Sequence, residues 1–283
     1  MRFTFLGTAS AFGYPQPFCT CADCTKARQE GGKNLRKRSA ALINDDLLID
    51  LGPDILTASY MHHISLANVR YCLQTHPHAD HLDLSHLLSR SLNLDTPPDM
   101  LHFYASPATL AYADELFQRD LAGYHLDTPQ AAEELHLALH TVSPFETFSA
   151  GLYQVTALRA NHAPNFQALI YAIAAEGQAV LYATDTEALP EETWQALNAL
   201  NFAFDLVIFD HTNGINPPAY GHLNAQLVTG HTRRMRQEGI LKESGEVYIT
   251  HIAHGGNPTH EALVEASRQN GYRVAYDGLV LDL

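Results

Sequence analysis

The segment THPHADH at residues 75–81 constrains this sequence more than any other feature. Directly after the apolar, strand-like run VRYCLQ, it places four metal-ligand side chains within six residues: His76, His78, Asp80 and His81. On an extended backbone the first two point the same way, and the following turn brings the other two to a neighbouring point. Imidazole pairs with a carboxylate suit borderline divalent ions such as zinc, manganese or iron. We therefore predict a metal centre at the end of a buried strand.

One segment cannot complete two metal sites, so further ligands must come from elsewhere in the chain. Three candidates also follow strand-like segments: His162, Asp185 and His251. Taken singly, each can be a surface histidine or an aspartate that starts a turn. Loops at one edge of a rigid pair of sheets can nevertheless converge on a metal, and their common position after strands favours that interpretation.

Strand-like segments dominate the chain and alternate with helical stretches. With 46% hydrophobic and 17% charged residues there is ample material for a packed interior, and no linker or internal repeat is visible. We expect residues 1–283 to form one α/β (α+β) domain in which two packed sheets carry helices on their outer faces.

The net charge of −14 disfavours nucleic acid as a partner, because phosphates would be repelled. One basic stretch, residues 26–38, holds six of the 17 basic residues and could be a solvated surface loop or a rim that steers phosphates. No apolar run reaches 18 residues and the chain starts directly on a strand-like segment, so we expect a cytoplasmic protein without a membrane span.

Three of the four cysteines fall within six residues: Cys19, Cys21 and Cys24. An odd, local cluster does not suit a disulfide framework, so a metal site is the better explanation, with a redox-active cluster as the alternative. Cys72 lies in an apolar strand-like context that is typical of an inert buried thiol.

The H-x-H-x-D-H pattern, followed by a mid-chain His, an Asp after a strand and a late His, resembles the metallo-β-lactamase superfamily over nearly the whole chain. The resemblance implies a four-layer αββα sandwich and two divalent metal ions. One ion would be held by His76, His78 and His162. The other would be held by Asp80, His81 and His251, with Asp185 bridging. In the segment LLIDLG, Asp50 would orient the ligand loop without binding a metal.

A narrower resemblance rests on the opening FLGTASAFGYPQPFCTCADC, on ITHIAH and on the closing VAYDGLVL. Together they are similar to the phosphoribosyl cyclic phosphodiesterase (PhnP) subgroup. This similarity implies a structural zinc in a Cys-rich loop at about residues 14–38, with the ligands Cys19, Cys21, Cys24 and His254. A closed Cys₃His site is also typical of structural rather than catalytic zinc. The segment GHLN implies that His222 acts in catalysis, as a general acid or as a phosphate hydrogen-bond donor.

These patterns predict a hydrolase that cleaves small, cyclic phosphodiesters through a hydroxide bridging two manganese, zinc or iron ions, with His222 and Asp80 as catalytic residues. The segment DHTNG at 210–214 and the region 92–130 depart from the subgroup and leave the exact substrate open. Alternatives are a thioester, lactone or β-lactam hydrolase, a transfer-RNA-processing nuclease, a di-iron redox protein and a non-catalytic metal-binding protein. The expected partner is a small-molecule substrate, and a homodimer is compatible with the sequence.

Overall fold

Two seven-stranded sheets form the centre of the computed structural model, which describes residues 1–92, 95–215 and 220–283. The first sheet has the order β14-β1-β2-β3-β4-β5-β6, with the strands Val280–Asp282, Arg2–Gly7, Ala40–Ile43, Leu47–Ile49, Tyr71–Leu73, Leu101–Ala105 and Leu137–Thr141. The second has the order β13-β12-β11-β10-β9-β8-β7, with the strands Arg273–Val274, Leu241–Thr250, Phe204–Asp210, Gln178–Ala183, Leu169–Ala175, Tyr153–Arg159 and Thr147–Ala150.

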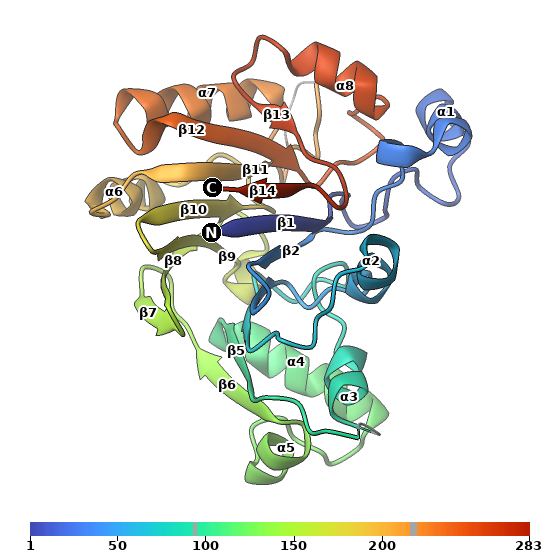
Figure 1. Ribbon diagram of the computed structural model, residues 1–283, viewed down its shortest axis with the longest axis vertical. Helices are drawn as coiled ribbons and strands as arrows, with labels where there is room; N and C mark the ends of the chain where they lie inside the picture. Colours follow the sequence, from blue (N-terminus) through green and yellow to red (C-terminus); the bar gives the residue numbers. More distant parts are fainter. Residues whose placement is uncertain (93–94, 216–219) are drawn as a thin grey trace.

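Helices flank the two sheets (Figure 1). In chain order α1 to α8 are Ala22–Glu30, Ile55–His62, Ser85–Ser91, Pro107–Asp120, Pro129–Glu134, Glu191–Ala199, Ala225–Gln237 and His260–Ser267. Two short 3₁₀ helices, η1 and η2, span Gly32–Asn34 and Pro164–Phe166. Several helices begin as their sequences predict. Ser106 and Thr128 cap α4 and α5 through side-chain oxygens, and each is followed by a proline in the first turn.

Three separate apolar clusters show that the molecule has four layers. The middle cluster joins the two sheets and includes Phe3, Tyr182 and Ile208. A second packs the first sheet against α2 to α5, for example through Phe103 and Phe117. The third packs the other sheet against α6 to α8 and includes Trp194 as well as residues of α7 and α8. The predicted αββα sandwich is therefore confirmed.

The strand directions bring the predicted ligands to one edge of the sandwich. β3 and β4 run parallel, as do β10, β11 and β12. β8 runs in the same direction as β10, because each is antiparallel to β9. The carboxyl ends of these strands precede or carry the residues of the site: Asp50, His76, His162, Asp185, Asp210 and His251. Parallel strand ends meet at a common edge, which is where such loops can converge on a metal.

The basic stretch at 26–38 is part of the folded framework. Arg36 is only 5% exposed and donates to Thr8 Oγ1, to the Ala275 carbonyl and to His260 Nδ1, at 2.6–2.8 Å. Arg38 forms a bidentate ion pair with a carboxylate of the loop before α2, and Lys37 pairs with one near the C-terminus. Arg36, Lys37 and Arg38 are therefore held within the fold and are not a solvated loop, whereas Lys26, Arg28 and Lys33 are exposed.

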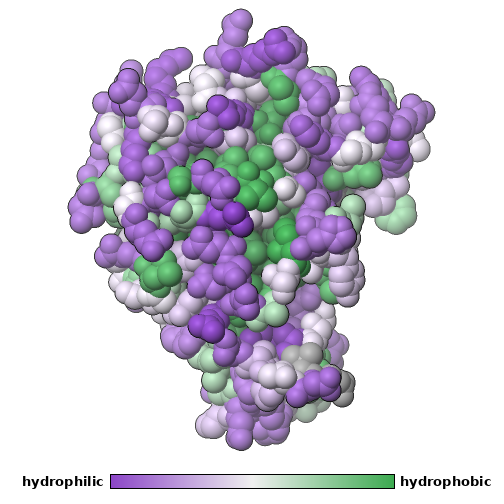
Figure 2. Space-filling model, viewed as in Figure 1, coloured by the Kyte–Doolittle hydropathy of each residue, from purple (hydrophilic) through white to green (hydrophobic). Residues whose placement is uncertain are grey.

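Hydrophilic residues cover most of the face shown in Figure 2, with hydrophobic residues gathered near its middle. None of the helices in the described part of the chain is long and apolar enough to cross a lipid bilayer.

Candidate metal centre

Three histidines form one half of the centre. His76 and His78 follow β4, and His162 follows β8. His76 Nε2 lies 2.8 Å from His78 Nδ1, which lies 3.4 Å from His162 Nε2. Burial, followed by the effect of neighbouring His81, holds the pKa of His76 well below its usual range. The ring is therefore neutral, which is the form that binds a metal.

Two carboxylates and two histidines form the other half, and all four are buried. Asp185 Oδ2 lies 2.5 Å from His81 Nε2 and 3.2 Å from His251 Nε2. Asp80 Oδ2 lies 3.1 and 3.5 Å from the same two nitrogens. Asp185 Oδ1 faces the first group, at 3.9 Å from His162 Nε2. The carboxylate of Asp185 thus lies between the two groups.

The donor atoms of this cluster fit metal ions. His81 Nε2 and His251 Nε2 lie 2.5 and 3.2 Å from Asp185 Oδ2, and all three atoms are buried, but their geometry gives none of them a hydrogen bond among the described residues. Leaving a buried polar atom unpaired costs about 1–3 kcal/mol, so three such atoms pointing at one place would be costly without a cation. Nitrogen and carboxylate donors in this number suit two borderline divalent ions.

Residues behind the ligands hold them in place. Asp50 is fully buried; its Oδ2 lies 2.7 Å from His81 Nδ1, and its Oδ1 accepts from the Thr75 backbone and side chain. The Thr212 hydroxyl lies 2.7 Å from His251 Nδ1. In both histidines these contacts leave Nε2 facing the cluster. Asp50 therefore has the orienting contacts predicted for it, and it is a member of neither ligand group.

The cysteine cluster forms separately, beside α1. Cys19, Cys21, Cys24 and His254 offer ligand atoms that all lie within 4.8 Å of one another. His254 Nδ1 is 3.5 Å from Cys19 Sγ and 3.7 Å from Cys21 Sγ. In a tetrahedral zinc site the bonds are about 2.3 Å to sulfur and 2.0–2.1 Å to nitrogen, so a sulfur ligand and the nitrogen ligand lie about 3.6 Å apart. Several hydrogen bonds lower the pKa of the Cys21 thiol to about 6 and so favour the thiolate. The bond from the Cys24 backbone N–H has the largest effect.

Comparison with known proteins agrees with this geometry. The profile of the beta-lactamase superfamily domain matches residues 46–252, which is most of the chain. The chain belongs to this superfamily. It is accordingly a hydrolase of the metallo-β-lactamase fold, and that fold is metal-dependent. A search among curated proteins gives no match.

Solved structures of this superfamily align with almost the entire chain. A diphosphatase of the PhnP family is 23% identical with a TM-score of 0.74, covering 99% of this chain and 97% of that chain. Zinc-bound PqqB from Methylobacterium extorquens is 19% identical with a TM-score of 0.70 and full coverage of both chains. The short form of human tRNase Z is 18% identical with a TM-score of 0.66, covering 100% and 99%. These identities show a common fold.

A cavity of about 560 Å³ opens above the metal centre of this superfamily member. Ligand residues from both groups line it, together with His222, with His254 from the cysteine cluster and with Phe12, which is 68% exposed at the rim. None of the described residues that line it is a lysine or an arginine. Positive charge in this cavity must therefore come from bound metals and from histidine.

His222 lies against the centre, as its predicted catalytic role requires. Its Nδ1 is 2.7 Å from Asp210 Oδ2 and 3.4 Å from Asp185 Oδ1. Burial lowers the pKa of His222, but the Asp210 carboxylate outweighs it and raises the pKa to about 9. Asp210 itself is fully buried at the end of β11.

Sequence analysis did not assign roles to Asp210 or Thr212. Asp210 ends an apolar strand, which is the same signal that identified Asp185 and His251. Applying that rule to every strand end would have found it. The sequence around Thr212 gives no comparable signal, because the contact of Thr212 is with His251, 39 residues further along the chain.

Proposed function

We propose that this hydrolase is a dinuclear metallophosphodiesterase that acts on small phosphodiesters, including cyclic ones. The observation that carries the proposal is the pair of His222 and Asp210, placed beside the ligand cluster. A phosphodiester with an alkyl leaving group departs as an alkoxide, which needs a proton. The pair offers one at the place where the ester bond would lie.

The ligand groups divide between two ions. His76, His78 and His162 would hold one, while Asp80, His81 and His251 would hold the other, with Asp185 shared. Zinc, manganese and iron all suit these donors. When bound, the ions would neutralise the phosphate charge and lower the pKa of a coordinated water. The cysteine cluster would hold a third, structural zinc away from the reaction.

The protein's own groups supply the proton. Asp210 holds Nδ1 of the imidazolium, because a carboxylate can only accept a hydrogen bond there. The other nitrogen, Nε2, makes no hydrogen bond to the described residues, so it can donate its proton from a ring that lines the cavity. The Asp210 carboxylate raises the pKa of His222 and so favours the imidazolium, the form that carries both protons. It can transfer the Nε2 proton to the departing oxygen and leave a neutral imidazole.

Charge favours a small substrate over a nucleic acid. A transfer RNA needs cationic contacts to many phosphates, whereas the cavity lining in the described residues contains neither lysine nor arginine. The chain as a whole carries a formal charge of −14. The resemblance to tRNase Z therefore supports the fold and the metal chemistry more than an RNA substrate.

A phosphoanhydride is the other substrate class to test, since one similar structure is that of a diphosphatase. A phosphate leaving group is a stable anion and needs little protonation. The thiolate that leaves when a thioester is cleaved also needs little protonation. The proton-donating pair is therefore better matched to an alkyl diester than to either alternative.

The test compares His222→Ala with the wild type on two diesters, after loading with manganese, zinc or iron. On a cyclic alkyl phosphodiester, kcat/KM should fall about 100-fold or more, because the leaving oxygen loses its proton source. On bis(p-nitrophenyl) phosphate, whose leaving group needs no proton, the loss should stay below about fivefold. Equal losses on both substrates would contradict the role of His222. Absence of any diester turnover by the loaded wild type would contradict the proposed function, and His125→Ala is a matched histidine control.

A further inference from the structure

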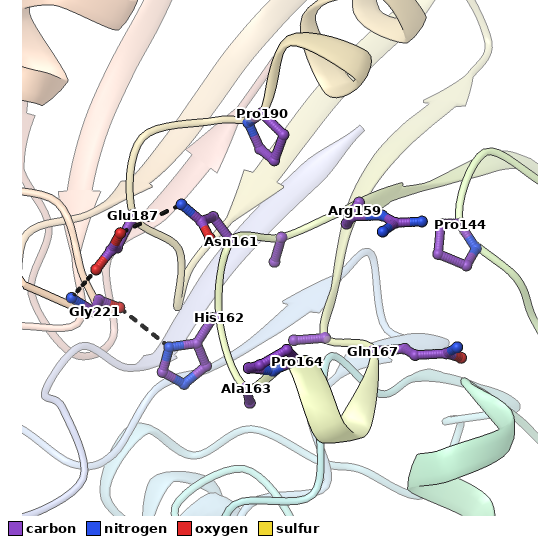
Figure 3. A pocket seen from close by; sticks show the side chains of 12 residues that line it. Pro144, Arg159, Asn161, His162, Ala163, Pro164, Gln167, Glu187, Pro190 and Gly221 are labelled. Atoms are coloured by element: carbon purple, nitrogen blue, oxygen red, sulfur yellow. Dashed lines mark hydrogen bonds between the residues drawn. The ribbon is translucent and has the colours of Figure 1, made fainter.

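The loop that carries His222 is joined to two metal-ligand loops at one side chain, Glu187. Its carboxylate accepts hydrogen bonds from the Gly221 backbone N–H and, at 3.3 Å, from Asn161 Nδ2. The Gly221 carbonyl in turn accepts from His162 Nδ1 at 3.1 Å. Figure 3 shows these contacts as a continuous series that runs from Asn161 through Glu187 and Gly221 to His162.

The last bond of the series sets the tautomer of His162. A carbonyl oxygen can only accept, so the contact requires the proton on Nδ1. Nε2 is then unprotonated, and it is the nitrogen that lies 3.4 Å from His78 Nδ1 and 3.9 Å from Asp185 Oδ1. A histidine that binds a metal through one nitrogen commonly donates the other to a carbonyl or carboxylate. The Gly221 peptide supplies that acceptor here.

The same peptide also sets the position of His222, which is the next residue. Backbone bonds tie Glu187 to the loop of the ligand His162, because the Glu187 N–H donates to the Asn161 carbonyl at 3.1 Å. The Asn161 N–H donates to Thr186 Oγ1 at 2.9 Å. Residues 161–162, 185–187 and 221–222 therefore form one hydrogen-bonded unit.

Glu187 itself is not placed to bind a metal. It is half-buried in the wall of a neighbouring cavity of about 520 Å³, and it belongs to neither ligand group. Figure 3 shows its carboxylate directed to Gly221 and Asn161, on the side of the cavity opposite Arg159 and Pro144. Its side chain is thus connected to the metal centre through its hydrogen bonds with the Gly221 N–H and with Asn161.

We propose that Glu187 is a positioning residue of the metal centre, which holds the Gly221 peptide and thereby sets the tautomer of His162 and the position of His222. The His222 part rests on the proposed function, whereas the His162 part depends on metal binding alone.

The test uses Glu187→Ala, Glu187→Gln and, as a matched control, Glu191→Ala. Glu191 lies nearby on α6 and pairs only with Arg234 in the described contacts. Competition with a chelating dye should show that Glu187→Ala binds one of the two catalytic zinc ions about 10–100-fold more weakly, while the cysteine site keeps its affinity as an internal reference. Glu187→Gln should stay within about threefold of the wild type, because its amide oxygen still accepts from Gly221 and only the 3.3 Å bond from Asn161 is lost. Glu191→Ala should match the wild type.

A further readout separates positioning from a general structural role. In ¹⁵N-histidine-labelled, zinc-loaded protein, His162 should show a protonated Nδ1 in the wild type and in Glu187→Gln, and a broadened or altered signal in Glu187→Ala. Wild-type zinc affinity and wild-type histidine signals in Glu187→Ala would overturn the proposal, as would an equal loss of zinc affinity in Glu187→Gln. If the wild type cleaved no phosphodiester, the proposed function would fail, but the zinc and NMR results would still decide the role of Glu187.

Discussion

Three residues of the metal centre adopt left-handed backbone conformations that non-glycine residues rarely take. The φ angles are 66° at Asp50, 50° at Asp185 and 58° at His251. Each residue comes just after a strand, where the backbone must turn sharply to direct the side chain into the cluster instead of across the sheet. Such conformations cost about 1–3 kcal/mol each and persist only where packed surroundings impose them. The buried ends of the two sheets provide that support and fix the directions of these side chains.

Replacing Asp185 by asparagine should test the shared carboxylate. The change keeps the size of the side chain but removes the charge between His81 and His251. We expect kcat/KM on bis(p-nitrophenyl) phosphate to fall by at least about 100-fold, since the paired ions lose their common anionic ligand. Metal analysis should show fewer than two catalytic ions per chain, with an unchanged circular dichroism spectrum. Asp282→Asn, a surface control that is 73% exposed, should keep its activity, and near-normal turnover in Asp185→Asn would show that the bridge is elsewhere.

At the residue scale, the sequence predicted the candidate metal ligands well and the residues that hold those ligands in place poorly. The ligand candidates all lie in the cluster because each follows a strand, and the ends of parallel strands share an edge. Asp210 and Glu187 act through partners 12 and 34 residues away, His222 and Gly221. Such contacts depend on which loops the fold brings together, and neither hydrophobic periodicity nor local spacing contains that information.

Among the elements, the helices α1, α2 and α5 and the strands β6 and β7 were not predicted. α1 buries only Cys24 and Ala27, so its sequence shows no apolar face. β6 and β7 are the edge strands of their sheets, and most of their residues are partly or fully exposed. Elements that bury little apolar surface leave a weak pattern in the sequence, whereas the central strands β8 to β11 were recognised because they are almost entirely buried.

The α1 region gives a prediction about the cysteine cluster. Cys21 also caps α1, because its Sγ accepts from the Cys24 N–H. Serine is itself a good cap, so Cys21→Ser should remove a zinc ligand without removing the cap. Loss of about 2 kcal/mol of zinc-linked folding free energy would lower the melting temperature by about 4–8 °C, with a smaller loss of activity through looser placement of His251.

Differential scanning calorimetry with and without a strong chelator provides the measurement. Chelation removes the catalytic ions from both proteins, so it should lower both melting temperatures, but by more in the wild type, which also loses the cysteine-bound zinc. If Cys21→Ser lost turnover while keeping its stability and its full zinc content, the cluster would have a catalytic or redox role, and the structural assignment would be wrong.

For the molecule as a whole, the layers were predictable and the strand pairing was not. Alternating strands and helices in an apolar-rich chain indicated two sheets covered by helices, and the structure confirms this arrangement. The first sheet nevertheless pairs β1 with β14, where Phe3 lies opposite Leu281 at the other end of the chain. Such long-range pairing is decided by packing across the whole sandwich. The buried Arg36 strengthens it by bonding to Thr8 and to the Ala275 carbonyl.

Two buried histidines far from the ligand groups make the stability of the whole molecule sensitive to acid. His231 Nε2 accepts from the Leu189 N–H at 3.1 Å, and His260 Nδ1 accepts from Arg36 at 2.8 Å. Burial, reinforced by Arg234 in one case and by Arg36 in the other, lowers both pKa values to about 4. Both rings must therefore be neutral in the folded protein.

In the unfolded chain His231 and His260 become protonated near pH 6.5, whereas in the folded protein they become protonated only near pH 4. The neutral rings thus contribute their full stability above pH 6.5, and this contribution is lost as the pH falls from 6.5 towards 4, by up to about 3 kcal/mol per histidine. His231→Gln and His260→Asn keep an acceptor in place of Nε2 and Nδ1 but cannot titrate. Urea unfolding at pH 7.5 and 5.0 should show that the double variant loses less stability between the two pH values than the wild type does, by about 2–4 kcal/mol, while titration of the metal ligands cancels in the comparison. An equal loss in both proteins would mean that His231 and His260 already titrate normally in the folded state.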